Sequence, residues 1–438
     1  MKLSRTTRSF FRTMSTLPTH NQYFQVGGKD IWSFINETAA AKAAKSGDGV
    51  ANLGQGFFSY SPPQFAIDSA KEAFEVAADN QYAPAQGKPV LIESLVKHYS
   101  GELGYQLSKD QVLVTTGANE GMFAAFFGLL NRGDEVIVFE PFFDQYIPNI
   151  EMAGGVVKYV KLHAPKDFDT RIVDANEYYI DWEELENAIT SKTKMVVLNT
   201  PHNPIGKVFS KEELTRIGNL AIKHNFVILS DEVYENLYFN IDSFPRIASF
   251  EDEELRRRVL FVGSAGKSFA ATGWRIGWVI GSLELMPYVR AAHTRICFSS
   301  PAPIQVAVSK SIEIADSGDY FSQMREEYAV KYQILENAFK ELQIPYTRAD
   351  GGYFLLVNFK KVKLPDSYKW PDSIEGKPRD FKLAYFLIEE FGVVAIPPTE
   401  FYRSGELELQ DCLRFAVCKD DRVLQDAARR LKGLAQYL

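Results

Sequence analysis

The stretch "RVLFVGSAGKSFAATGWRIGW", residues 258–278, joins a buried-strand pattern to an isolated lysine. Its first part, "RVLFVGSAG" (258–266), is a short and nearly continuous apolar run, which predicts a strand covered on both faces of a sheet. Lys267 follows directly, and the next cation is Arg275. Lysine is among the side chains least often fully buried, and no acid in the stretch can pair with it. We therefore expect Lys267 to be functional, with small neighbours that leave room for a ligand.

Four similar apolar runs precede this strand, and longer helical stretches separate several of them. They are "QVLVTT" (111–116), "DEVIVFE" (134–140), "TKMVVLN" (193–199) and "FVILSDE" (226–232). A helix is expected after the first run, ending near Gly133, and another is expected to open at Ser210 with two glutamates in its first turn. This alternation predicts an α/β fold with a mostly parallel sheet and crossover helices.

The C-terminal part has a different pattern, which predicts a second, smaller α+β domain. After a helical region over about 302–343 come three short strands, "GYFLLVNF" (352–359), "GVVAIPP" (392–398) and "CLRFAVC" (412–418). The charged, proline-rich stretch 360–380 is expected to be a surface excursion. We predict an N-terminal arm that is part of the small domain (21–62), a large domain (63–310) and a C-terminal small domain (311–438).

Composition narrows the class of function. The 438 residues carry a net charge of −7 without long acidic or basic blocks, which argues against a nucleic-acid partner. The six histidines and three cysteines have no metal-ligand spacing, so no metal site is predicted. The longest apolar stretch, "MFAAFFGLL" from Met122, is far too short to cross a membrane.

Residues 1–20 differ from the rest of the chain. They carry Lys2, Arg5, Arg8 and Arg12 among many hydroxyl side chains, and no acid precedes Asp30. This basic, amphipathic and acid-free pattern is typical of a mitochondrial targeting segment, although an unstructured tail is the alternative. A second start, at position 14, would omit all four cations. We therefore expect the protein in both mitochondrion and cytoplasm.

Residues of unusual chemistry follow the ends of the predicted strands, where open parallel sheets bind their ligands. "TTGANEG" places Gly117 and Ala118 at a helix start, where free N–H groups suit a phosphate or simply form a cap. "EPFFD" offers Phe143, which could stack on a planar ring or belong to the core. "NTPHNPIG" holds Asn203 in a proline-fixed loop, where it could donate to a ligand oxygen or belong to an ordinary turn.

The fourth strand ends in "SDEVY", which places Asp231 and Tyr234 at the same edge as Lys267. A carboxylate there needs a cationic partner, because burying it alone would be costly. A nucleotide-binding P-loop is excluded because Phe261 stands where that motif needs glycine, and no serine-hydrolase elbow occurs. A phosphate cradle, an aromatic plate, an amide donor, an acid with a tyrosine and a lysine together suit pyridoxal 5'-phosphate.

These segments resemble the fold-type I, class I aminotransferases. The likeness lies in "NLGQG" (52–56), "NQYAPAQG" (80–87), "NTPHNPIGKVF", "SDEVY", "GSAGKSFAATGWRIGW" and "LRFAVCKD". It runs from about Trp32 to the C-terminus and is closest to the kynurenine aminotransferase, glutamine transaminase K and cysteine-S-conjugate β-lyase subgroup. The resemblance implies a pyridoxal 5'-phosphate enzyme that is a homodimer with active sites at the subunit interface.

The resemblance also implies a role for each matching residue. Lys267 would bind the cofactor covalently, Asp231 would pair with its ring nitrogen, and Asn203 and Tyr234 would contact its phenolic oxygen. Phe143 would stack on the ring. The implied phosphate ligands are Gly117, Ala118, Ser264, Arg275 and Tyr82 of the partner subunit. The implied substrate-binding residues are Arg414, which would hold the α-carboxylate, Asn203, Trp32, Gly56, Phe354 and Phe298 of the partner subunit.

The reaction that the resemblance implies is transfer of the amino group of L-kynurenine to a 2-oxo acid such as 2-oxoglutarate, giving kynurenic acid. Aromatic and sulfur amino acids and glutamine are further expected donors, and β-elimination from cysteine conjugates is the alternative. A regulatory module without turnover is disfavoured, because the full residue set is present and no DNA-binding domain accompanies it. Asn119 and Ser299 stand where many kynurenine aminotransferases have an aromatic residue and a histidine, which leaves the side-chain preference open.

Overall fold

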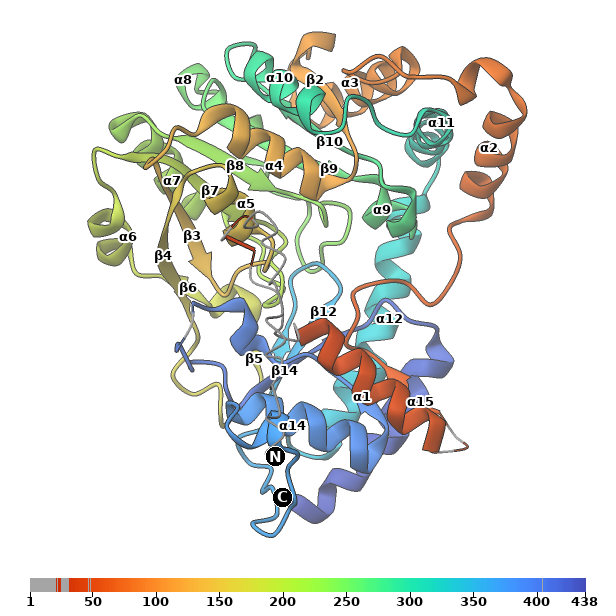
Figure 1. Cartoon of the computed structure of the whole chain (residues 1–438), viewed down its shortest axis with the longest axis vertical. Coiled ribbons are helices and arrows are strands. Elements are labelled where there is room, and N and C mark those ends of the chain that lie inside the picture. The colour runs from red at the N-terminus through yellow and green to blue at the C-terminus, as the bar shows by residue number, and fades with distance from the viewer. Residues whose placement is uncertain (1–20, 22, 25–30, 46, 48, 404) are drawn as a thin grey trace, which may run out of the picture.

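The computed structural model describes residues 21, 23–24, 31–45, 47, 49–403 and 405–438. The predicted targeting segment, residues 1–20, lies outside this part of the chain. The described part has a large sheet flanked by helices and, below it in Figure 1, a smaller region of short strands and helices. None of the described helices is long and apolar enough to span a membrane.

The large sheet has eight strands in the spatial order β2-β10-β9-β8-β7-β3-β4-β6. In chain order they are β2 (Val112–Thr115), β3 (Glu135–Glu140), β4 (Val156–His163), β6 (Tyr179–Ile180), β7 (Thr193–Asn199), β8 (Val227–Asp231), β9 (Val259–Ser264) and β10 (Gly277–Gly281). β10 is antiparallel to both β2 and β9, and β6 is antiparallel to β4, whereas the other pairs are parallel.

The five strands expected from the sequence are therefore confirmed, and they all run in the same direction. Three strands were not predicted. β4 has lysines within it and is fully buried at only two of its eight positions, so it lacks the continuous apolar run of the other strands. β6 has only two residues. β10 is short and bounded by glycines, within the lysine-containing stretch, where no strand was predicted after β9.

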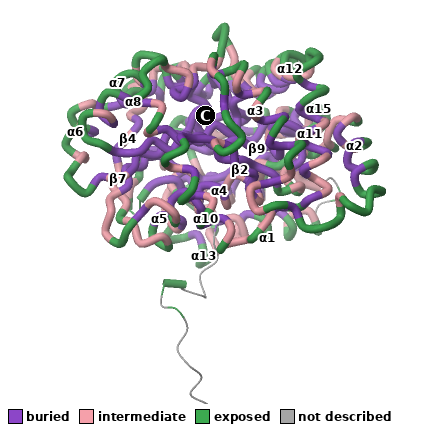
Figure 2. Tube along the Cα trace, turned by 90° about the horizontal axis from the view of Figure 1, so that it is seen from above, coloured by how far each residue is buried: buried purple, intermediate pink, exposed green. Residues whose placement is uncertain are grey.

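Helices cover both faces of the large sheet. Its alternating side chains divide between two hydrophobic clusters, one shared with α3, α7 and α11 and the other with α4, α5 and α10. These helices are α3 (Pro89–Leu103), α4 (Ala118–Leu129), α5 (Tyr146–Met152), α7 (Lys211–His224), α10 (Met286–Ile296) and α11 (Ala302–Ser317). Helix α2 (Gln64–Glu75) and the short helices α6 (Trp182–Ala188), α8 (Glu253–Arg256) and α9 (Ala265–Ser268) complete this region. Figure 2 shows the sheet buried between exposed outer helices.

The smaller region has a hydrophobic cluster of its own around two antiparallel strands. Its strands are β12 (Phe354–Asn358) and β14 (Cys412–Ala416), with the two-residue pairs β1 (Ala51–Asn52) with β13 (Val393–Val394) and β5 (Val173–Asp174) with β11 (Thr347–Arg348). Its helices are α1 (Ile31–Lys45), α12 (Tyr320–Glu341), α13 (Asp372–Glu375), α14 (Arg379–Phe386) and α15 (Asp421–Leu431).

Two details differ from the sequence prediction. The helical region over 302–343 is divided into α11 and α12, which meet around Gly318. The stretch 360–380 is not wholly a surface excursion, because Val362 and Ile374 are buried in the core of the smaller region. Apolar side chains spaced widely among charges gave no local sign of that burial.

Candidate active site

The amine of Lys267 lies at the carboxyl edge of the large sheet, against the smaller region. Lys267 belongs to α9, the single helical turn that follows β9. Its Nζ donates to the Tyr353 hydroxyl at 2.6 Å and lies 3.5 Å from the Gly56 carbonyl oxygen. Removal of the amine from water lowers the pKa of Lys267 to about 8, although Asp231 opposes the shift. A nucleophilic amine at near-neutral pH is what covalent chemistry on a carbonyl requires.

Asp231 ends β8 and is buried. Burial raises the pKa of its carboxyl group to about 6, while a hydrogen bond from the Tyr146 hydroxyl and one from the Val233 N–H oppose that shift. Among the described residues, no cationic side chain is bonded to this carboxylate. Its ionised form would be stabilised by a cationic group of a ligand. Phe143, three residues after the end of β3, packs against the same tyrosine, with its ring 5.6 Å from that of Tyr146.

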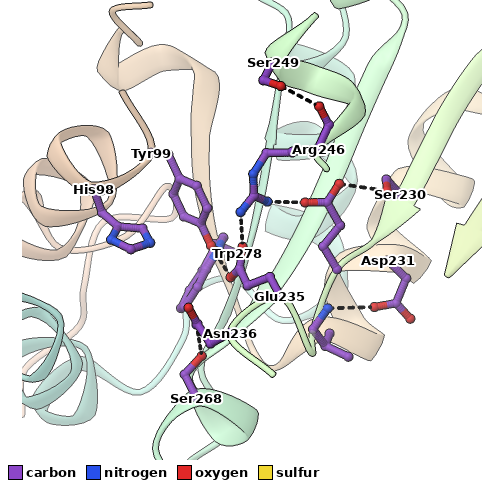
Figure 3. A network of polar contacts seen from close by, with 12 residues as sticks. His98, Tyr99, Ser230, Asp231, Glu235, Asn236, Arg246, Ser249, Ser268 and Trp278 are labelled. Atoms are coloured by element: carbon purple, nitrogen blue, oxygen red, sulfur yellow. Dashed lines mark hydrogen bonds and ion pairs between the residues drawn. The ribbon is translucent and has the colours of Figure 1, made fainter. Parts of the chain in front are cut away.

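The residue after Asp231 belongs to a different network, one of buried ion pairs and hydrogen bonds, drawn in Figure 3. Successive side chains of an extended segment point to opposite sides, so Glu232 turns away from Asp231 and pairs with buried Arg246. Arg246 also binds Glu235 at 2.6 Å, and Glu235 accepts a 2.6 Å hydrogen bond from Tyr99. A cleft of about 1330 Å³ borders this network and contains none of the predicted site residues. The network therefore anchors the end of β8 from behind.

Trp278 on β10 completes that network and occupies space that we expected a ligand to use. Its Nε1 donates to Tyr99 at 2.8 Å, and it pairs across the sheet with Gly263. A Cβ at position 263 would lie 2.0 Å from the Trp278 Nε1 atom. The glycine at 263 therefore admits an indole from the protein itself, and the expectation that the small neighbours of Lys267 leave room for a ligand is wrong at this position.

The start of α4 forms a cradle of suitable shape and charge for a phosphate. Gly117 precedes the helix with a φ of 79°, and a Cβ there would lie 2.4 Å from Nη2 of Arg275. The guanidinium is thus pressed against the first turn, where the N–H groups of Ala118 and its successors have no intrahelical acceptor. Ser264, the last residue of β9, pairs with Gly277, the first residue of the neighbouring β10. Gly277 in turn lies against the backbone N–H of Ala118 in the same turn.

Polar side chains hold this first turn in place. Glu120 accepts from the Thr116 N–H at 3.0 Å and lies 3.0 Å from Nδ1 of buried His293. Cys297 lies nearby, but its Sγ is 3.4 Å from Nδ1 and 3.9 Å from Nε2 of the same ring, which places it over the ring face. A metal bound to Nδ1 would lie in the ring plane, so we interpret the cluster as a hydrogen-bonded support. Asn119 accepts from Asn149 at 2.9 Å.

Arg414, on β14, is buried and binds two residues of other segments. Its Nη1 donates to Oδ1 of Asn203 at 3.0 Å and its Nη2 to the Gly54 carbonyl at 3.1 Å. Burial lowers the pKa of Arg414 to about 10, and its Nε has no partner among the described residues. Because the amide oxygen of Asn203 faces the guanidinium, its NH₂ group is turned toward another acceptor. The two hydrogen bonds use two of the five guanidinium N–H groups, so the amide NH₂ group and the remaining guanidinium donors, Nε among them, are left for a ligand.

Aromatic side chains surround that guanidinium. Its Cζ lies 4.1 Å from the ring centroid of Phe354 and 5.5 Å from that of Trp32. Trp32 donates from Nε1 to Asp144 at 3.1 Å, and a Cβ at Gly56 would lie 3.0 Å from the Phe354 ring. The predicted substrate-binding residues of this chain are therefore brought together. The ring centroid of Tyr234 lies 6.1 Å from that of Phe354.

Tyr82 and Phe298, which we assigned to the partner subunit, lie together on the surface of this chain. Their rings are 5.8 Å apart, and they are 88% and 55% exposed, respectively. Phe298 has a φ of 67°, which is unfavourable for a bulky residue. Because both rings are exposed on this chain, both can be reached by a second chain.

Sequence reasoning missed Tyr146 and Tyr353. Tyr353 precedes β12 and is 86 residues from Lys267 along the chain, yet it makes the shorter of the two contacts to Nζ. Tyr146 begins α5 and reaches Asp231 from 85 residues away. The sequence around these two tyrosines gives no local sign that they bond to Asp231 or Lys267. The only available signal was that a buried carboxylate such as Asp231 in "SDEVY" needs hydrogen-bond donors.

Comparison with known proteins agrees with this geometry. A family model described as aminotransferase class I and II matches residues 48–431. The chain is 55% identical to the Saccharomyces cerevisiae protein named "Probable kynurenine–oxoglutarate transaminase BNA3", over 98% of this chain and 99% of that one. The crystal structure of Bna3p from the same yeast superposes with a TM-score of 0.93, at 56% identity over 96% of this chain and 99% of that one. YbdL from Escherichia coli, described with a methionine aminotransferase function, superposes with a TM-score of 0.82 at 28% identity, over 95% and 100% of the two chains.

Proposed function

Since the chain belongs to the class I and II aminotransferase family, we propose that it transfers the amino group of L-kynurenine to a 2-oxo acid such as 2-oxoglutarate. The proposal includes pyridoxal 5'-phosphate as the cofactor. The observation that carries it is the hydrogen bond between Arg414 and Asn203. It joins the guanidinium that we assign to the substrate carboxylate to the amide that we assign to the cofactor. The name of the 55% identical yeast protein supports kynurenine as the donor.

The residues at the sheet edge fit this cofactor. The first turn of α4, against which the Arg275 guanidinium packs so closely that only a glycine fits at 117, offers N–H groups and a positive charge that suit the phosphate. Asp231 offers an anion to the ring nitrogen, while Asn203 and Tyr234 offer donors to the phenolic oxygen, and Phe143 supplies an aromatic face. When bound, the cofactor accepts the electron pair that is left when the substrate α-carbon loses its proton.

The protein's own groups then divide the work. Nζ of Lys267 would hold the cofactor covalently in the resting enzyme, and its free amine would take the proton from the substrate α-carbon. Asp231 must be ionised to keep the ring nitrogen protonated, and the hydrogen bond from Tyr146 favours that ionised state. Arg414 orients the substrate through its carboxylate, with a planar fork that holds both oxygens.

We propose a homodimer in which Tyr82 and Phe298 of the partner subunit complete each site. Their exposure and mutual contact support this assignment, because an exposed aromatic pair is typical of an interface. The same aromatic pocket would admit aromatic and sulfur amino acids and glutamine. For residues 1–20 we propose mitochondrial import with a second, cytosolic form, which would be tested by the location of a reporter fused to them.

Conversion of kynurenine and 2-oxoglutarate to kynurenic acid by the purified protein tests the main proposal. Absence of kynurenic acid, with transfer from other donors intact, would reassign the substrate. Methionine is the second candidate donor, because YbdL has the same fold. Release of pyruvate from a cysteine conjugate, faster than amino transfer, would instead identify β-elimination as the main reaction.

A further inference from the structure

The hydroxyl of Tyr353 lies between the amine of Lys267 and the Gly56 carbonyl oxygen. It accepts a 2.6 Å hydrogen bond from Nζ and donates a 2.7 Å hydrogen bond to that carbonyl. Tyr353 is fully buried, and burial raises the pKa of its hydroxyl well above the usual value. The group therefore stays protonated, and its one proton is shared by the Gly56 carbonyl and the neighbouring Tyr234 hydroxyl, which leaves only acceptor capacity toward the amine.

The ring of Tyr353 is itself held on several sides. It lies 4.8 Å from the ring of Tyr234 at 77°, 4.8 Å from Phe354 and 6.4 Å from Tyr328. The Lys267 amine is 5.2 Å from the Tyr353 ring and 5.6 Å from the Tyr234 ring. An amine at this position is beside the hydroxyl of one tyrosine and the faces of two, and no carboxylate in the described part of the chain is bonded to it.

We propose that Tyr353 is a positioning residue, which holds the Lys267 amine whenever the amine is not covalently bound. The inference rests on the proposed role of Lys267 as the cofactor-binding lysine. Between the covalent states the amine must stay where it can reach the substrate α-carbon, and a flexible four-carbon side chain does not ensure this. The hydroxyl fixes that place from the smaller region, while the carbonyl of Gly56 fixes the hydroxyl.

The proposal predicts the protonation of the amine as well as its place. A hydroxyl oxygen that accepts from Nζ stabilises the ammonium more than the neutral amine, so it raises the pKa of Lys267 against the larger effect of burial. Loss of the hydroxyl should therefore lower the pKa of Lys267 further. An effect of about one pH unit is expected for one hydrogen bond to a charged group.

The test uses Tyr353→Phe in the full chain loaded with pyridoxamine 5'-phosphate, whose amino group leaves Lys267 free without any turnover. Acetylation of Lys267 at a series of pH values, followed by peptide mass spectrometry, gives the midpoint of its reactivity. Tyr328→Phe is the matched control, because it removes a buried hydroxyl that bonds to Tyr60 and belongs to the same aromatic cluster. The midpoint should fall by about one pH unit in Tyr353→Phe only.

A second readout separates positioning from stability. With amino donor and 2-oxo acid, Tyr353→Phe should lower kcat roughly tenfold to a hundredfold with KM for the donor unchanged, because substrate contacts remain. If that variant does not fold, 3-fluorotyrosine placed at position 353 keeps the shape with a weaker acceptor and should lower the midpoint by less. An unchanged midpoint in both forms, or an equal change in Tyr328→Phe, would overturn the proposal. Failure of the proposed function would instead appear as missing amino transfer in the unmodified protein with the change of midpoint retained.

Discussion

Replacement of Arg414 by lysine tests whether this side chain binds the substrate carboxylate. The arginine makes two hydrogen bonds from separate nitrogens, to Asn203 and to Gly54, and its Nε remains available. A lysine ammonium keeps the charge but cannot span these acceptors and a carboxylate together. At least one charge-assisted hydrogen bond to the substrate is lost, and such a bond contributes about 1.5–3 kcal/mol.

That loss corresponds to a decrease of roughly 10- to 150-fold in kcat/KM, since each 1.4 kcal/mol is a factor of ten. Most of it should appear as a higher KM, because the carboxylate is bound alike before and during the reaction. Steady-state kinetics with kynurenine, methionine and glutamine provide the measurement. Arg379→Lys is the control, because Arg379 pairs with Asp411 in the smaller region and makes no contact with Arg414 or Asn203. Unchanged kcat/KM for all three donors in Arg414→Lys would refute this account of carboxylate binding.

Four further outcomes are expected at the cofactor site. Lys267→Ala should remove the visible absorbance of the covalently bound cofactor, and retention of that absorbance would contradict the assignment. In the unmodified protein, covalent attachment should slow tenfold for each pH unit below about 8, because only the neutral amine attacks and the pKa of Lys267 is lowered to about 8; a flat rate between pH 6 and 8 would contradict this. Gly117→Ala should weaken cofactor binding about tenfold or more in fluorescence titration, since its Cβ would lie 2.4 Å from Arg275, whereas unchanged affinity would exclude the cradle. Tyr146→Phe should raise the pKa of Asp231 above about 6 and weaken cofactor binding near pH 6 more than at pH 8; equal weakening at both would argue against it.

The sequence predicted the strand ends because their signal is local. An apolar run identifies each buried strand, and the chain must leave it at the carboxyl edge, so the next residue of unusual chemistry falls at that edge. Asp231 and Gly117 lie there for this reason. Arg275 lies at the same edge because it precedes β10, which is antiparallel to β9 and begins opposite the end of β9. The antiparallel β10 was missed, because its apolar run is only Trp278, Val279 and Ile280, enclosed by a glycine on each side.

Contacts that join distant segments could not be read in the same way. The hydroxyls that hold Asp231 and Lys267 come from Tyr146 and Tyr353, each more than 80 residues away along the chain. Their partners depend on how the smaller region docks against the sheet and on the angle of α5, which no local pattern specifies. The exposed pair of Tyr82 and Phe298 was assigned only through resemblance, since a single chain offers no physical reason to place it at a site.

Gly263 must be small, as its place near Lys267 suggested, but the physical reason differs from the one we expected. Its smallness suggested space for a ligand near Lys267, yet the indole of Trp278 fills that space from the neighbouring strand. The indole in turn binds Tyr99, whose hydroxyl donates to Glu235 within the network behind β8. A larger residue at 263 would therefore displace an element of the support for Asp231 before it obstructed any ligand. At position 263 the small residue therefore serves first to let β9 and β10 pack against each other, and the ligand site at their ends depends on that packing.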